Sequence, residues 1–150
     1  MPNYTGIYLA QLAATSVSIA KTLVQINAPA DAPIELLRAW VSFNSVTSTA
    51  IEIGIKRVST AGTGTSFTAL LLRQGNAAFG GTTTTDHTAE GTIGDVLMRS
   101  FVNYLNGFLY LPIPEERIII QPSGRLSLYL PTAPGAAVTI SAGVIFAELS

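Results

Sequence analysis

The sequence predicts an all-β fold: an antiparallel two-sheet sandwich of jelly-roll kind, with a small barrel as the alternative. Three observations predict it. Apolar and polar residues alternate with period two, as in AIEIGIK at 50–56, where the three isoleucines share one face. Turn-forming residues separate the apolar stretches, as at 61–64 and 131–135. No window of helical length keeps an apolar helical stripe free of β-branched residues.

The same patterns place the strands along the chain. Residues 1–6 are expected to form an extended amino-terminal arm, and the Gly- and Thr-rich stretch 74–95 a long loop, which in a compact domain is usually functional or disordered. A chain of 150 residues is expected to form one domain, 1–150, around one core. The expected strands are 6–13, 16–20, 23–27, 34–43, 50–58, 67–72, 96–102, 108–111, 117–121, 125–130 and 137–149.

The strand at 34–43 has an amphipathic pattern that directs Trp40 outward. If Leu37, Ala39 and Val41 face the core, Arg38 and Trp40 lie on the opposite face. An outward tryptophan beside an arginine is typical of an interface anchor. The sequence leaves open whether a partner, a loop of the same chain or a second core layer covers it.

The last strand, 137–149, is apolar on both faces in its second half. Val144 and Phe146 take one face, and Ile145, Ala147 and Leu149 take the other. A strand that is apolar on both faces is buried on both faces. In so small a sandwich, we expect another subunit to cover the second face.

The composition excludes several classes of partner. Charged residues make up 11% of the chain, against about 25% in soluble domains, and the net charge is −1 with scattered basic residues. We therefore expect no direct binding of nucleic acid or of a membrane surface. The apolar runs fall short of the ~20 residues of a spanning helix. The amino terminus lacks a basic leader, so we expect synthesis in the cytoplasm.

The residues that could carry catalysis are few. His87 is the sole histidine, and with Asp86 and Glu90 it could ligate a metal, but the spacing matches no known site and we favour a solvated loop histidine. The adjacent Glu115 and Glu116 indicate a solvated corner rather than a glycosidase pair. We expect no enzyme activity, no metal and no cofactor; a hydrolase using His87 is a rival hypothesis.

Aromatic residues are the stronger candidates for binding. They could anchor a protein interface, or stack on a sugar, although a sugar site also needs clustered Asp, Asn or Gln side chains. Together with the polar and apolar residues singled out above, they give the expected interface: Tyr4, Tyr8, Arg38, Trp40, Phe79, Tyr104, Tyr110, Ile145 and Leu149.

Motifs in the second half of the chain resemble a known group. They are Pro-x-Pro-Glu-Glu at 112–116, Pro-Ser-Gly-Arg-Leu at 122–126, Pro-Thr-Ala-Pro at 131–134 and Thr-Ile-x-Ala-x-Val-Ile-Phe-Ala-Glu-Leu at 139–149, with TLVQINAPADAPIELLRAWVSF at 22–43 earlier in the chain. From about Thr15 onward the chain is similar to small β-sandwich capsid decoration (cement) and minor virion proteins of tailed bacteriophages. It departs from them in the Thr-rich stretch at 82–85, so loop contacts are not carried over.

The resemblance implies a structural virion protein. Such proteins form trimers or clusters that bind the major capsid protein on the outside of the shell and stabilise it, after synthesis in the host cytoplasm. A carbohydrate- or receptor-binding jelly-roll module of a phage tail or fibre is the alternative function.

Overall fold

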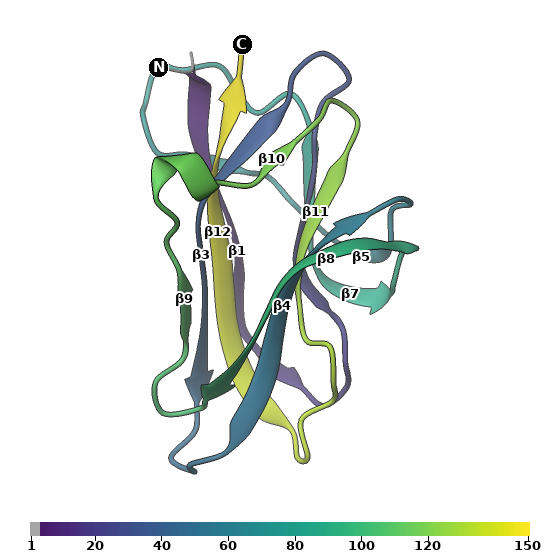
Figure 1. The fold of residues 1–150 in the computed structure, drawn as a ribbon, viewed down its shortest axis with the longest axis vertical. Coiled ribbons are helices and arrows are strands. Elements are labelled where there is room, and N and C mark those ends of the chain that lie inside the picture. The colour runs from purple at the N-terminus through teal and green to yellow at the C-terminus, as the bar shows by residue number, and fades with distance from the viewer. Residues whose placement is uncertain (1–3) are drawn as a thin grey trace.

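The computed structural model describes residues 4–150 and confirms the all-β prediction. Two antiparallel sheets lie side by side with their apolar faces turned toward each other (Figure 1). The jelly-roll connectivity remains a prediction. Residues 1–3 of the expected arm lie outside the described residues, and Tyr4–Gly6 already belong to the first strand rather than to an arm.

Sheet A contains both ends of the described chain. Its long central strand, β12, lies between β1 and β3, and β9 and β10 both pair with the other edge of β3. The short η1 turn, Pro114–Glu116, connects β9 to β10 and places Glu115 and Glu116 at an exposed corner, as expected. The strands of sheet A are β1 (Tyr4–Val17), β3 (Ile34–Asn44), β6 (Leu70–Leu71), β9 (Phe108–Tyr110), β10 (Ile119–Ile120) and β12 (Val138–Leu149).

Sheet B runs in the order β5-β7-β2-β11-β4-β8, so β5 and β8 form its edges. Its central strands β2 and β11 are buried along almost their whole length. The strands of sheet B are β2 (Thr22–Asn27), β4 (Ala50–Val58), β5 (Thr63–Phe67), β7 (Thr82–Ala89), β8 (Ile93–Asn103) and β11 (Arg125–Tyr129).

The core lies between the sheets and follows the predicted alternation. Ile51, Ile53 and Ile55 of β4 are at most 4% exposed, and the leucines of β11 point into the same layer. On the facing sheet, Val144 and Phe146 of β12 are buried beside Tyr8 and Ala10 of their neighbour β1. Burial of alternate residues from both sheets therefore holds the sandwich together.

The prediction of one long loop at 74–95 is wrong for much of that stretch. Residues Thr82–Ala89 form β7, which pairs with both β2 and β5, and β8 begins at Ile93. Threonine is β-branched and favours strands, and alternate residues of β7 (Thr83, Thr85 and His87) are buried. The polar composition did not reveal a strand, because the buried residues of this strand are themselves polar. The stretch 16–20 was likewise wrongly predicted as a separate strand: β1 continues through Val17 and ends there.

A β-bulge changes the expected face of Leu37. Ile145 pairs with Arg38 and the next residue, Phe146, pairs with Leu36, so β3 has one extra residue at this point. Leu36 is therefore buried in the core, at 1% exposure, and Leu37 is not. The prediction that Trp40 lies on the opposite face from Ala39 and Val41 is unaffected, because these residues lie beyond the bulge.

In the part of the chain that the structure describes, no helix is long and apolar enough to cross a membrane.

Candidate interaction surface

The face of sheet A that points away from sheet B is mostly apolar, with a few polar side chains. Strand register aligns Leu70, Leu9, Ile145 and Arg38 in one row across four strands. Leu109 and Ile119, at the β9 and β10 edge, are 55% and 50% exposed. We define the outer face of sheet A by Tyr4, Ile7, Leu9 and Gln11 on β1, Glu35, Arg38 and Trp40 on β3, Leu70 on β6, Leu109 on β9, Ile119 on β10, and Gly143, Ile145, Ala147 and Leu149 on β12.

Trp40 lies flat near the middle of this face because its neighbour has no side chain. Gly143 of β12 is its register partner, and a Cβ atom at Gly143 would collide with the six-membered ring of Trp40. The Arg38 guanidinium carbon stands 5.8 Å from the centre of the Trp40 ring, within the range of a cation–π contact. A hollow of about 300 Å³ opens beside the ring and is lined also by Asn106 and Leu109. Trp40 thus forms a partly exposed aromatic platform.

A polar cluster lies toward one end of the same face. Arg117 Nη1 donates to the Tyr4 hydroxyl at 3.3 Å and lies 3.7 Å from Glu35 Oε1. Glu35 is 5% exposed, and its Oε2 is buried without a hydrogen-bond partner in residues 4–150. Burial, assisted by the hydrogen bond and the charge of Glu35, raises the pKa of Tyr4 above its usual value. The cluster therefore holds the buried Glu35 side chain at one end of the outer face of sheet A.

Of the predicted interface residues, Tyr4, Arg38, Trp40, Ile145 and Leu149 lie on this face. Ile145 and Leu149 are half-buried, as is Trp40, because each is surrounded by neighbouring strands of the sheet.

The remaining four aromatic residues are placed elsewhere, and the expectation that they reach a partner is wrong for the buried ones. Tyr8 is 0% exposed and Tyr104 is 7% exposed, since both pack into the core. Phe79 is half-buried against Tyr8, with ring centres 5.3 Å apart, and helps to close the sandwich beside β1. Tyr110 is the register partner of the inward Ala39, and burial raises its pKa. Strand alternation alone places Tyr8 and Tyr110 inward.

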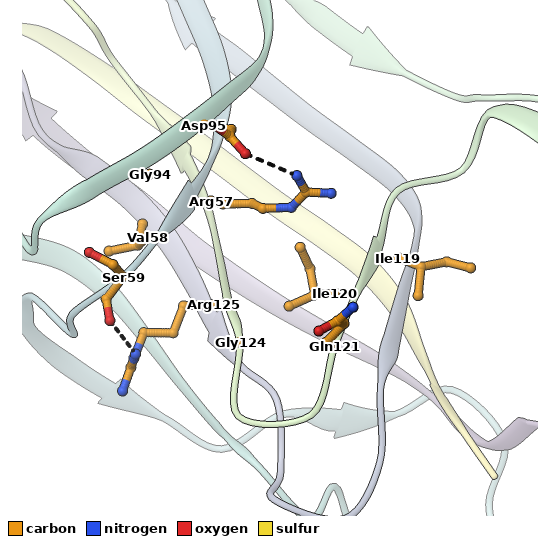
Figure 2. A pocket seen from close by; sticks show the side chains of 10 residues that line it. All are labelled: Arg57, Val58, Ser59, Gly94, Asp95, Ile119, Ile120, Gln121, Gly124 and Arg125. Atoms are coloured by element: carbon orange, nitrogen blue, oxygen red, sulfur yellow. Dashed lines mark hydrogen bonds and ion pairs between the residues drawn. The ribbon is translucent and has the colours of Figure 1, made fainter.

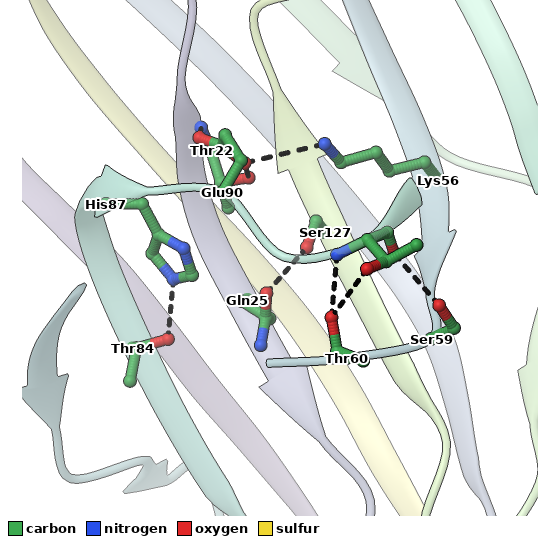
Figure 3. Close-up of polar contacts among 10 residues, drawn as sticks. Thr22, Gln25, Lys56, Ser59, Thr60, Thr84, His87, Glu90 and Ser127 are labelled. Atoms are coloured by element: carbon green, nitrogen blue, oxygen red, sulfur yellow. Dashed lines mark hydrogen bonds and ion pairs between the residues drawn. The ribbon is translucent and has the colours of Figure 1, made fainter. Parts of the chain in front are cut away.

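The outer face of sheet B is polar over β2 and β11, where the chain itself covers part of it, and it ends at the exposed Phe101 of edge strand β8. The segments 59–64 and 89–92 pack on each other, with Thr92 N–H donating to Thr60 Oγ1 at 2.8 Å (Figure 3). Glu90, in the second of these segments, accepts hydrogen bonds from the backbone N–H and the hydroxyl of Thr22, both at 2.5 Å. Lys56 Nζ lies 3.5 Å from Glu90 and 4.2 Å from the centre of the Tyr129 ring. Thr22, Lys56 and Glu90 therefore find their polar partners within one chain.

Glu90 and Lys56 form the charged centre of this cover. The Lys56 side chain is 3% exposed and that of Glu90 is 36% exposed. Burial raises the pKa of Glu90, but the hydrogen bonds from Thr22 and the charge of Lys56 outweigh it and hold the pKa below its usual value. The carboxylate therefore stays ionised and fixes segment 89–92 on the sheet.

His87 is a buried strand residue and not the solvated loop histidine that we expected. It is 1% exposed, and its Nε2 is 2.7 Å from Thr84 Oγ1. Gly62 and Gly64 pack directly against the ring. Burial lowers the pKa of His87, so the neutral form is favoured. Among residues 4–150, no group of three or more acidic or histidine side chains could hold a metal ion.

Sequence reasoning missed several residues of the outer face of sheet A. Ile7 and Leu9 are half-buried on this face, between the inward Tyr8 and Ala10. The signal was present, because the stretch GIYLAQLA is apolar at both alternating sets of positions. Leu70 and Leu109 carried no comparable signal, since they lie on strands of two and three residues whose pairing depends on the tertiary fold.

Comparison of the chain with protein-family models, curated proteins and solved structures finds no match.

Proposed function

We propose that this chain is a structural virion protein that self-associates through the outer face of sheet A and stabilises the outside of a bacteriophage capsid. The observation that carries the proposal is the apolar band on that face, from Leu70 through Leu9 and Ile145 and then past Arg38 to Trp40 and Leu109. Large exposed apolar patches mark interaction sites, because water-exposed apolar surface favours association. The resemblance to capsid decoration proteins supports the same function.

The occupant we propose for this face is a second copy of the chain. The face carries both signs of charge: Arg38 and Glu35 lie in adjacent rows, paired with Ile145 and Ala147. Glu35 Oε2 is a buried acceptor without a partner in the described chain, and Arg38 is an exposed donor. A neighbouring copy that covers this face can bring an acceptor to the exposed Arg38, whereas Glu35 is 5% exposed and stays within its own chain. The resemblance favours a trimer, with the assembled unit contacting the major capsid protein.

The mechanism is additive burial. Apolar area contributes about 25 cal/mol per Å², of which association costs cancel a large part, so one contact is weak. Repetition of that contact over a capsid lattice makes the sum large. No bond is made or broken in this function.

Sedimentation equilibrium tests self-association. The variant Ile145→Lys adds a charge at the centre of the outer face of sheet A, and Phe101→Lys adds the same charge on sheet B, where Phe101 is 74% exposed. We expect the native chain and Phe101→Lys to form the same oligomer and Ile145→Lys to be monomeric. A native chain that stays monomeric at every concentration would contradict the proposal.

Electron microscopy of antibody-labelled virus particles tests the capsid role. We expect label over the outer surface of the shell. Label confined to tails or fibres would instead support the alternative function.

The alternative, a carbohydrate-binding module of a tail or fibre, is favoured by one observation. The Trp40 platform borders a hollow lined by Asn106 and Arg38, and stacking on an aromatic ring with nearby polar donors is one way to hold a sugar. Reproducible binding on a glycan array that disappears in Trp40→Ala would favour it over self-association.

A further inference from the structure

The cover of sheet B encloses the side chain of His87, a residue type that titrates near neutral pH. The side chain is 1% exposed. A Cβ atom at Gly62 would collide with its Nδ1, and a Cβ atom at Gly64 would collide with its Cδ2, so segment 59–64 lies directly on the ring. Contacts this close leave no room for water between the ring and the segment.

The two nitrogens of the ring differ in what they contact. Nε2 of His87 is 2.7 Å from Thr84 Oγ1 (Figure 3), whereas Nδ1 is buried and has no hydrogen-bond partner in residues 4–150. The Ala89 carbonyl is close enough to favour the charged ring, but its position falls short of a hydrogen bond. Protonation makes both nitrogens donors and adds a charge that burial disfavours. A protonated ring is therefore poorly accommodated while the segment covers it.

The charged groups around His87 do not offset its burial. Asp86 on β7 and Glu90 beyond its end favour the charged ring, and Lys56 on β4 disfavours it. The two glycines that touch the ring bring no charge. Asp86 already pairs with Lys21 at 2.6 Å, and Glu90 already pairs with Lys56 at 3.5 Å. Burial outweighs the attraction and lowers the pKa of His87, so the closed cover favours the neutral ring.

Segment 59–64 has an anchor that does not titrate near neutral pH. Arg125 Nη1 donates to the Ser59 carbonyl at 2.9 Å, beside a groove of about 520 Å³ between edge strands β10 and β8 (Figure 2). Arg57, the other arginine of the groove, points away from Arg125 and pairs with Asp95 at 3.3 Å. Because arginine stays charged, the first residue of the segment stays attached when the ring is protonated.

We propose that the cover of sheet B is a pH-sensitive switch, in which protonation of His87 lifts the stretch 61–64 from the ring and lets water reach it. The glycines in this stretch allow its backbone to change conformation. Ser59 keeps the stretch attached at one end, and Glu90 keeps the other segment of the cover on the sheet. The open form presents a cationic imidazolium at the surface of sheet B. The switch lies on the sheet opposite the proposed self-association face, so either proposal can fail without the other.

Nuclear magnetic resonance of the full chain tests the switch. The ring signals of His87 report its protonation, and their broadening by a neutral gadolinium chelate reports access of solvent to the ring. Because the open ring binds a proton more readily than the covered ring, the ratio of open to closed forms should rise by up to about tenfold for each pH unit below about 6.5. We expect protonation and broadening to share one midpoint, while the signals of the core isoleucines stay unchanged.

Three outcomes of this titration would overturn the switch. The ring could become protonated and stay protected from the chelate, which would mean that the closed cover accommodates the charge. The ring could stay neutral and protected down to about pH 5, well below its ordinary pKa. The core signals could change together with the ring signals, which would mean that the whole sandwich unfolds and that the cover does not open by itself.

Variants at the cover separate the switch from a general effect of pH. Gly62→Ala places a Cβ atom against Nδ1, so we expect the ring to be accessible already at about pH 7.5 and its pKa to return to about 6.5. Gly135→Ala is the matched control, because a Cβ atom there meets nothing within 4 Å, and it should behave as the native chain does. In His87→Gln the amide signals of Gly62 and Gly64 should lose their shift with pH. A protected ring in Gly62→Ala, or a shift that persists in His87→Gln, would overturn the proposal.

Discussion

The outer faces of the two sheets differ in polarity and in how far the chain itself covers them. On sheet B, the face is polar over its central strands, where the chain's own segments 59–64 and 89–92 cover it and Glu90 pairs with Lys56 and Thr22. On sheet A, the face is apolar around Trp40 and Ile145, and its edges are half-exposed. A polar face needs directional partners at fixed distances, which local loops supply. An apolar face needs only contact area, which any complementary surface can supply.

The difference assigns distinct roles to the two faces. Groups on sheet B contribute to folding, since an unpaired buried charge or hydroxyl destabilises the folded state. Under the proposed self-association, the half-exposed groups on the outer face of sheet A contribute mainly to association, since water still reaches them in the separate chain. Substitutions on the two faces should therefore affect different measurements.

Of the three single-site tests, we expect the largest change in the free energy of unfolding from detaching segment 89–92 from sheet B. Glu90→Gln removes the charge that pairs with Lys56 and weakens both hydrogen bonds from Thr22. We expect a loss of about 2 kcal/mol in the free energy of unfolding, measured with urea. Asp95→Asn is the matched control: it removes an exposed ion pair to Arg57 and should change stability by less than about 0.5 kcal/mol. Equal losses in the two variants would mean that segment 89–92 is not anchored by Glu90.

The pH dependence of the free energy of unfolding is a second test of burial in sheet B. Its expected effect is smaller than that of Glu90→Gln. The pKa of His87 is lowered by burial in the folded state, so the unfolded state binds more protons. Stability should be fully present above the unfolded pKa of about 6.5 and decrease as the pH falls below it, until the folded pKa is passed. Glu90, whose pKa is also lowered, should add a further loss below its unfolded value of 4.5.

Urea unfolding between about pH 8 and about pH 5 isolates the histidine contribution, because most carboxylates titrate below that range. In His87→Gln the slope over this range should disappear. Direct titration of the His87 ring signals by nuclear magnetic resonance should give a pKa below the ordinary value. A native chain whose stability is flat over this range, or a His87 pKa above the ordinary value, would contradict the burial argument.

The smallest expected change in stability comes from the outer face of sheet A. Leu9→Thr introduces a β-branched residue that favours strands and shortens a half-buried side chain. We expect the free energy of unfolding of the separate chain to change by about 0.5 kcal/mol, while self-association weakens clearly in sedimentation. A matched core change, Leu128→Thr, should instead cost several times more stability, because Leu128 is 2% exposed. Comparable stability losses at Leu9 and Leu128 would mean that the outer face is already covered within the chain.

The candidate interaction surface was predictable in its centre and not at its edges. Trp40, Ile145 and Leu149 follow from alternation along two long strands, and the structure places all three on the outer face of sheet A. Leu70, Leu109 and Ile119 lie on strands of two or three residues, whose positions depend on distant partners. Tyr8 and Tyr104 show the reverse error, since an aromatic ring fits a core as well as an interface.

The sequence by itself determined the all-β class, the inward isoleucines of β4, the leucines of β11 and the two apolar faces of β12, because strand periodicity is a local property of the backbone. The tertiary structure alone decided that His87 is buried, that Lys56 meets Glu90, and that Arg57 and Arg125 line one groove. Each of these contacts joins side chains from separate segments of the chain. No local pattern specifies such contacts, which arise when the sheets pack and the loops between strands settle on them.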